Sequence, residues 1–211
     1  MRPLKKQNCA YRFTRIDEHN SEKEQPMRRN FGVKPMVYPM PVFILGTYDE
    51  HGMPNAMNAA WGGISEENEI TICVSASHKT TKNFEKSGAF TVSMATVDYV
   101  RACDYVGIES GNKVIDKLER CGLHTVRSEF VNAPIILELP MTVECTVKSY
   151  DPESCRLVGE IVNVSCDDSV MTDGKIDPDK LRPITYDSAN HTYRVIGEVV
   201  GKAFSDGLFY K

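Results

Sequence analysis

The sequence predicts a small β-barrel with helices packed on its outside. Three observations indicate this fold class: several short strand-like runs at close spacing, few helical patterns, and many turns rich in Gly and Pro. A doubly wound sheet would need regular alternation of strands with full-length helices, and that alternation is absent. A chain of 211 residues fits one larger domain better than two full domains.

The first half of the chain contains four strand patterns. Residues 1–26 are polar and show no apolar periodicity, so we expect a loosely ordered extension followed by one domain over residues 27–211. A helical pattern over residues 76–88 ends at Gly88, as a helix C-terminus would. The strands expected are residues 41–48, 54–63, 70–75 and 89–95, with a turn at 49–52.

The second half contains the clearest strand. Residues 141–148 alternate apolar and polar side chains, which is typical of a strand with one wet face, and residues 155–165 return as its hairpin partner. Short surface helices are expected over 97–108 and 112–123, a loop with one helical turn over 172–187, and strand-like structure over 192–204.

Composition excludes several classes of function. The formal net charge is -4 and the basic residues are scattered, so nucleic acid is not expected as a partner. The longest apolar run, Val42–Leu45, is far shorter than the ~20 residues of a membrane helix. No secretory signal is present, so we expect a cytoplasmic protein without a membrane partner. The seven cysteines form no C-x-x-C pair and the histidines no ligand spacing, so we expect reduced thiols and no metal site.

The stretch from Ser75 to Asn83 is rich in hydrogen-bond donors. It lies where a strand passes into a helix, and a helix N-terminus offers unpaired N–H groups and a positive dipole end to an anion. Two ammonium groups, several hydroxyls and an amide surround that point. The stretch therefore describes a phosphate cradle, although an ordinary surface helix capped by Ser77 would look similar.

The stretch Asn58–Gly63 holds the only tryptophan, Trp61, among small residues. Ala and Gly let a flat ligand approach the backbone, while the indole offers a wall. A tryptophan packed in the core beside a strand-end turn is the alternative interpretation. Taken together, the two stretches suggest an aromatic ligand with a phosphate tail.

Six segments in order resemble the flavin reductase-like proteins of the FMN-binding split barrel, in the flavoredoxin branch. The resemblance covers about residues 30–208. It rests on YPMPVFILGTYDEHGMPNAMNAAWGG, SASHKTTKNFEKSGAFTVSM, DYVGIESGNKVIDKLERCGL, LVGEIVNV, KLRPITYD and YRVIGEVVGKAFSDG.

The resemblance implies a six-stranded antiparallel split barrel and a homodimer with one non-covalent FMN per subunit near the interface. By position, Asn58, Ala59, Ala60 and Trp61 would line the isoalloxazine ring. The ribityl phosphate would be held by Ser75, Ser77, His78, Lys79, Thr80 and Asn83. Tyr105, Ser110 and Lys117 lie in a segment that approaches the flavin in this family, without an assigned role.

The resemblance also implies an FMN-dependent reductase that passes electrons to a flavin or small acceptor without a conventional catalytic side chain. Family members that use NADH often carry Gly-Asp-His where this chain has Pro152–Ser154, which leaves NADH or NADPH as donor in question. A non-enzymatic FMN electron carrier with a redox partner protein is the alternative. A binding module for another phosphorylated aromatic, such as pyridoxal phosphate, is a third.

Overall fold

The computed structural model describes residues 27–211, so the expected N-terminal extension lies outside the described residues. The chain divides into two units, Met1–Lys34 and Pro35–Lys211. The described part of the first unit, residues 27–34, is exposed and contains no helix or strand. All of the elements described below belong to the second unit.

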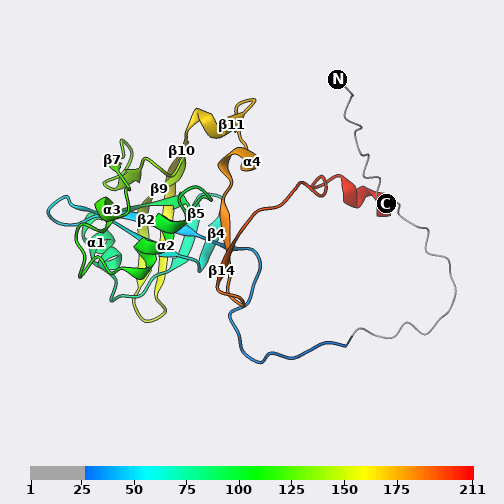
Figure 1. The fold of residues 1–211 in the computed structure, drawn as a ribbon, viewed down its shortest axis with the longest axis horizontal. Coiled ribbons are helices and arrows are strands. Elements are labelled where there is room, and N and C mark those ends of the chain that lie inside the picture. Colours follow the sequence, from blue (N-terminus) through cyan, green and yellow to red (C-terminus); the bar gives the residue numbers. More distant parts are fainter. Residues whose placement is uncertain (1–26) are drawn as a thin grey trace, which may run out of the picture. The chain divides into compact units, whose positions relative to one another are not determined.

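The main sheet is antiparallel and curled, which confirms the expected mainly-β split-barrel class (Figure 1). It has seven strands where six were expected. Their order across the sheet is β3 (Pro54–Ala59), β2 (Phe43–Tyr48), β6 (Ala89–Met94), β9 (Met141–Asp151), β10 (Arg156–Cys166), β5 (Glu69–Cys73) and β4 (Gly62–Glu66).

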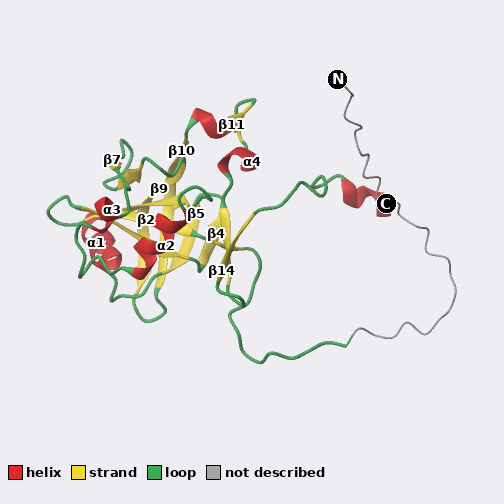
Figure 2. Ribbon diagram, in the orientation of Figure 1, coloured by secondary structure: helices red, strands yellow, loops and turns green. Residues whose placement is uncertain are grey.

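Three smaller sheets surround the main one. They are β1 (Met40–Pro41) with β13 (Ile184–Asp187) and β14 (Thr192–Val195), β7 (Thr125–Arg127) with β8 (Pro134–Ile136), and β11 (Met171–Thr172) with β12 (Lys175–Ile176). The helices are α1 (Lys79–Ser87), α2 (Val100–Ile108), α3 (Lys117–Arg120) and α4 (Pro178–Leu181), with 3₁₀ turns at Asp168–Val170 and Asp206–Tyr210. Figure 2 shows α1, α2 and α3 gathered beside the main sheet, and all three contact β3.

Strand β2 separates two apolar cores. Ile44 packs with residues of α2 and α3, while the adjacent Leu45 packs with the other cluster, which includes Phe84 of α1. Successive side chains of a strand point to opposite faces, so a strand buried on both faces has no apolar and polar alternation. This explains why the apolar run in this strand is continuous in the sequence.

The prediction that the polar side chains of residues 141–148 face solvent is wrong for two of them. Thr142 and Glu144 are both buried. The Glu144 carboxylate accepts hydrogen bonds from Ser128 Oγ, from Asn163 Nδ2 at 2.6 Å and from Ser165 Oγ at 3.1 Å. Glu144 therefore belongs to a buried hydrogen-bond network, which an alternation pattern cannot distinguish from solvent exposure.

Several element boundaries also differ from the sequence prediction. The strand expected over 54–63 is two strands, because the chain turns at Ala60 and Trp61 and β4 pairs with β5 rather than β2. The helix expected over 112–123 is reduced to α3. The loop over 172–187 has the expected helical turn, α4, but it also contains β12 and β13. The strand-like segment 192–204 ends at Val195. Strands β7 and β8 were not predicted, since each has only three residues.

Candidate functional site

A cavity of about 480 Å³ opens where three segments meet. These segments are the turn between β3 and β4, the N-terminus of α1, and the chain from the end of α2 to α3. Its volume lies in the range of pockets that hold cofactors, about 300–1,000 Å³. The cavity brings together eight of the ten residues predicted as flavin ligands: Asn58, Ala59, Ala60, Trp61, Ser77, His78, Lys79 and Thr80.

The N-terminus of α1 reaches this cavity without a cap. His78 is the N-cap residue, with φ -69° and ψ 147°, and its side chain makes no capping hydrogen bond. The alternative of an ordinary surface helix capped by Ser77 is therefore wrong. No acidic side chain lies in the first turn. Unpaired N–H groups and the positive end of the dipole thus face a pocket, which is the arrangement that favours an anion.

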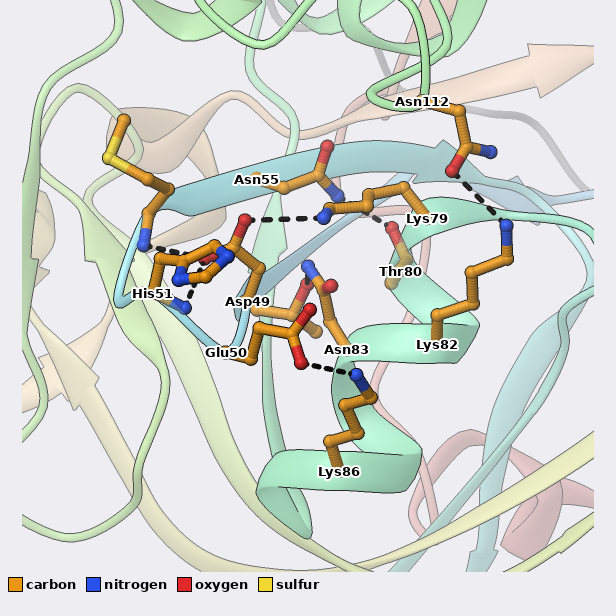
Figure 3. A network of polar contacts seen from close by, with 12 residues as sticks. Asp49, Glu50, His51, Asn55, Lys79, Thr80, Lys82, Asn83, Lys86 and Asn112 are labelled. Carbon is orange, nitrogen blue, oxygen red and sulfur yellow. Dashed lines mark hydrogen bonds and ion pairs between the residues drawn. The ribbon is translucent and has the colours of Figure 1, made fainter.

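Three lysines of α1 are held by partners on neighbouring segments (Figure 3). Lys79 Nζ lies 3.2 Å from Asp49 Oδ2, Lys86 pairs with Glu50, and Lys82 Nζ donates to Asn112 Oδ1 at 3.4 Å. Of the three, only Lys79 lines the cavity. Its ammonium is therefore oriented by a carboxylate while its side chain remains part of the pocket wall.

Asp49 is an ion-pair partner with a perturbed pKa. Burial raises the pKa of Asp49, but hydrogen bonds from the backbone N–H groups of Met53 and His51 and from Lys79 outweigh that effect. The pKa of this carboxyl therefore lies below its ordinary value. Asp49 therefore stays ionised at neutral pH and holds the Lys79 side chain in place through the 3.2 Å contact.

Ser75 and Asn83 are the two predicted residues that do not line the cavity. Ser75 Oγ lies 3.1 Å from Ser77 Oγ and thus supports a residue that does. Asn83 is one helical turn beyond Lys79, buried against β2, where its Nδ2 donates to Thr47 Oγ1 at 3.0 Å. The helical period explains this placement, because residue i+4 lies a turn further from the N-terminus.

The turn between β3 and β4 forms the second side of the cavity. Trp61 is 55% exposed, so the alternative of a core tryptophan is wrong. The turn is fixed to the sheet through the Trp61 carbonyl, which accepts a hydrogen bond from the Cys73 N–H at 2.8 Å. Asn58 Nδ2 donates to the Cys103 carbonyl of α2 at 3.1 Å, which holds the turn against that helix.

Lys117 is a buried ammonium group on the third side. It is 2% exposed, and its Nζ donates to the carbonyls of Val106 at 3.0 Å and Glu109 at 2.8 Å. An ammonium group has three donors, so one remains for a ligand in the cavity. Burial lowers the pKa of Lys117 to about 8, with smaller opposing effects from Cys121 and Glu109.

Two glycines let the third side approach the sheet. A Cβ on Gly107 would lie 2.8 Å from the Asn58 Cβ, and one on Gly111 would lie 2.1 Å from Asn55 Oδ1. Asn55 in turn donates to Thr80 Oγ1 of α1 at 2.9 Å. The resemblance placed this segment near the flavin without a role for Tyr105, Ser110 or Lys117; Ser110 and Lys117 line the cavity, and Tyr105 does not. The lining residues that were not predicted as flavin ligands are Asn55, Met57, Cys73, Val106, Gly107, Ile108, Glu109, Ser110, Gly111 and Lys117.

The chemistry of the donors fits FMN. An uncapped helix N-terminus and a lysine suit a phosphate, a turn of small residues beside an indole suits a flat ring, and a buried ammonium suits a carbonyl or developing negative charge. Over residues 27–211, no cluster of three or more His, Cys, Asp or Glu residues could hold a metal. Nor does this part of the chain contain a helix long and apolar enough to cross a membrane.

Comparisons with known proteins point the same way. In its fold the chain is similar to flavoredoxin of Desulfovibrio vulgaris (Miyazaki F), at 36% identity and a TM-score of 0.82, covering 86% of this chain and 100% of that one. It is also similar to a flavoredoxin from Methanosarcina acetivorans, at 26% identity and a TM-score of 0.78, covering 89% of this chain and 100% of that one.

A protein of Halalkalibacterium halodurans without an assigned function is 27% identical over 177 residues, which span 77% of this chain and 84% of that protein. The family model described as flavin reductase like domain matches residues 36–200. That match includes all three sides of the cavity and most of the chain. The chain therefore belongs to the flavin reductase-like domain family.

Proposed function

We propose that this protein binds FMN in the cavity of about 480 Å³ and acts as an FMN-dependent reductase of the flavoredoxin type. The observation that carries the proposal is the uncapped N-terminus of α1, which opens onto a cavity also lined by Lys79 and the turn Asn58–Trp61. The first-turn N–H groups, the Ser77 hydroxyl and the Lys79 ammonium would hold the phosphate. Ser75 and Asn83 would then contribute indirectly, by fixing the position of Ser77 and of α1.

The bound flavin supplies the transfer of two electrons. The residues of this chain would bind it, orient it and stabilise negative charge on its ring. Lys117 suits that last role, since it is buried and held by two backbone carbonyls with a donor to spare. No side chain need act as a general acid on the flavin, so we propose no catalytic residue of the conventional kind.

The visible spectrum of the purified protein tests this proposal. We expect flavin absorption bands after addition of FMN and removal of the excess by gel filtration, followed by bleaching with NADH or NADPH in the absence of oxygen. A protein that retains no flavin would contradict the proposal. A spectrum with a band near that of pyridoxal phosphate would instead indicate a different phosphorylated aromatic ligand.

An electron carrier that works with a redox partner protein is the second candidate, favoured by one feature of the β9–β10 hairpin. Its turn contains Pro152, Glu153 and Ser154, with Ser154 Oγ donating to Asp151 Oδ2 at 2.5 Å, and none of these residues lines the cavity. The turn thus offers no imidazole to a nicotinamide. In this case dithionite or a reduced partner would bleach the bound flavin, whereas NADH and NADPH would not.

We further propose that the protein is a homodimer. After β14 the chain leaves the sheet as an extended arm (Figure 1). Apolar side chains along this arm are almost fully exposed in the single chain, among them Val200 at 94% and Phe209 at 86%. An exposed apolar surface of this kind is typical of an interface with another chain.

A further inference from the structure

A second cavity of about 400 Å³ adjoins the first. The two cavities share a wall, formed by Asn58, Ala60, Gly107 and Ile108. The second is otherwise lined by Asp104, Tyr186, His191 and Tyr193. A molecule in it would therefore lie next to a ligand bound in the first cavity.

Two tyrosines give this cavity an aromatic side. Tyr186 of β13 and Tyr193 of β14 are directly opposed partners in the antiparallel pair, and both are half-buried. Their ring centroids lie 6.0 Å apart with the planes tilted by 51°. Aromatic walls of this kind favour a planar ligand over a flexible one, because ring contacts add to the area that is buried.

The two tyrosine hydroxyls differ in what they can offer a ligand. Tyr193 Oη donates to Asp104 Oδ1 at 2.7 Å, so its only donor is used. Tyr186 Oη lies 2.9 Å from His191 Nδ1. When that ring nitrogen carries a proton it donates to Tyr186 Oη, and the Tyr186 hydroxyl is then free to donate into the cavity.

The charge of the lining selects against anions. Asp104 is the only carboxylate among the lining residues, His191 is the only group that can become cationic, and neither Lys nor Arg is present. A bound pyrophosphate or carboxylate would be repelled by the Asp104 carboxylate and would have no Lys or Arg side chain to pair with. The chemistry therefore fits a neutral planar compound whose carbonyl oxygen accepts a hydrogen bond.

We propose that the second cavity binds a quinone-type electron acceptor, with Tyr186 donating a hydrogen bond to one quinone oxygen. This inference rests on the proposed function, because reduction of the quinone needs FMN in the first cavity. Two electrons and two protons convert a quinone to a hydroquinone. His191, as imidazolium, would pass its Nδ1 proton to the Tyr186 hydroxyl as that hydroxyl passes its own proton to the quinone oxygen. A hydride from reduced FMN would supply both electrons and the other proton.

Titration calorimetry with duroquinone tests the binding step. Its ring carries four methyl groups, so it does not alkylate cysteine, and with oxidised FMN no electron transfer occurs. We expect one duroquinone per chain in protein saturated with FMN. Tyr186→Phe should weaken duroquinone binding about tenfold, the effect of one hydrogen bond, and leave the Kd for FMN unchanged. Tyr99→Phe, the same change at an exposed tyrosine outside both cavities, should alter neither.

A second measurement tests whether Tyr186 delivers a proton to the quinone. After reduction with dithionite, we expect Tyr186→Phe to slow reoxidation by duroquinone, which needs protons. Reoxidation by ferricyanide, which takes one electron and no proton, should be unchanged. Equal slowing with both acceptors would indicate a structural effect and overturn the role of Tyr186.

Three other results would overturn the proposal: no duroquinone binding to FMN-saturated protein, displacement of FMN by duroquinone, or equal duroquinone affinity in Tyr186→Phe. If FMN itself does not bind, the proposed function is contradicted, but the quinone proposal is not yet decided. The same duroquinone titrations on flavin-free protein would then still decide whether Tyr186 binds the quinone.

Discussion

Lys79 and Lys117 are the two lysines that line the cavity proposed for FMN, and the protein holds them differently. Lys79 stands at the start of α1 and is paired with Asp49, whereas Lys117 is buried between two backbone carbonyls. The first is positioned for an anion at a helix N-terminus. The second has a lowered pKa, so its charge depends on pH near neutrality.

Replacing Lys79 by alanine should weaken FMN binding by about one to two decades, the effect of one lost charge-assisted contact. The fold should remain intact, because the Lys79 side chain is half-buried at the edge of the cavity. Fluorescence titration of FMN measures the loss. Lys86→Ala is the matched control: Lys86 lies in the last turn of α1, also pairs with a carboxylate and does not line the cavity. Equal FMN affinity in Lys79→Ala and the wild type would remove Lys79 from the site.

The affinity for FMN should fall as pH rises above about 8, where burial places the pKa of Lys117 in the free protein. A negative ligand favours the charged lysine and raises that pKa, so above pH 8 binding takes up a proton. The Kd should then rise by up to tenfold per pH unit, and below pH 8 it should be flat with respect to this group. Titrations between pH 7 and 9 measure the slope.

Lys117→Met should remove this slope, while Lys113→Met, at an exposed lysine of the same segment, should keep it. A wild-type Kd that does not change over this pH range would contradict the role of Lys117.

At the scale of elements, the sequence predicted the helix that opens onto the cavity and strand β3 beside it, but not the turn at Ala60 and Trp61 that ends this strand. The expected helix end at Gly88 is confirmed, because the C-cap there has φ +70°, which glycine adopts without strain. The third wall was harder to predict, since it is made by chain packing and not by a local pattern. Asn112 shows why: it accepts from Lys82 and donates to the Ser77 carbonyl, contacts between residues 30 and 35 positions apart.

Gly107→Ala should separate α2 from β3 and weaken FMN binding. The new Cβ would lie 2.8 Å from the Asn58 Cβ, and neither backbone can yield without moving the cavity wall. Overpacking of this kind costs about 1–3 kcal/mol of stability. Thermal unfolding and FMN titration measure the two effects. Gly63→Ala is the control, because its Cβ would meet no atom within 4 Å. Wild-type stability and FMN affinity in Gly107→Ala would show that this close approach is not needed.

For the whole molecule, family membership and the split-barrel fold agree with what the ordered segments of the sequence suggested. The C-terminal arm differs from the prediction. Residues 192–204 were expected to be strand-like throughout, but the strand ends at Val195. The apolar residues beyond the strand, such as Val199 and Val200, are exposed in the single chain. A run of β-branched residues is typical of a strand, but the run itself does not show whether a pairing partner lies beside it. In the proposed homodimer, a second copy of the chain would bury these side chains.

Removal of the arm should therefore convert a dimer into a monomer. Polar substitution of Phe204 and Phe209 to serine should do the same without shortening the chain, because both side chains are exposed in the single chain and need a partner for burial. Sedimentation velocity gives the oligomeric state, with Val126→Ser as the control at an exposed apolar residue of β7. A monomeric wild type, or a dimer that survives both changes, would contradict the homodimer.

The central claim is that α1 presents its N-terminus to the phosphate of a flavin. Parallel equilibrium titrations of the flavin-free protein with FMN and with riboflavin test it most directly, since the two ligands differ only in that phosphate. The account predicts one FMN per chain and riboflavin binding weaker by about two decades or more, the sum of several charge-assisted contacts. Equal affinities for the two flavins, or no binding of FMN, would contradict it.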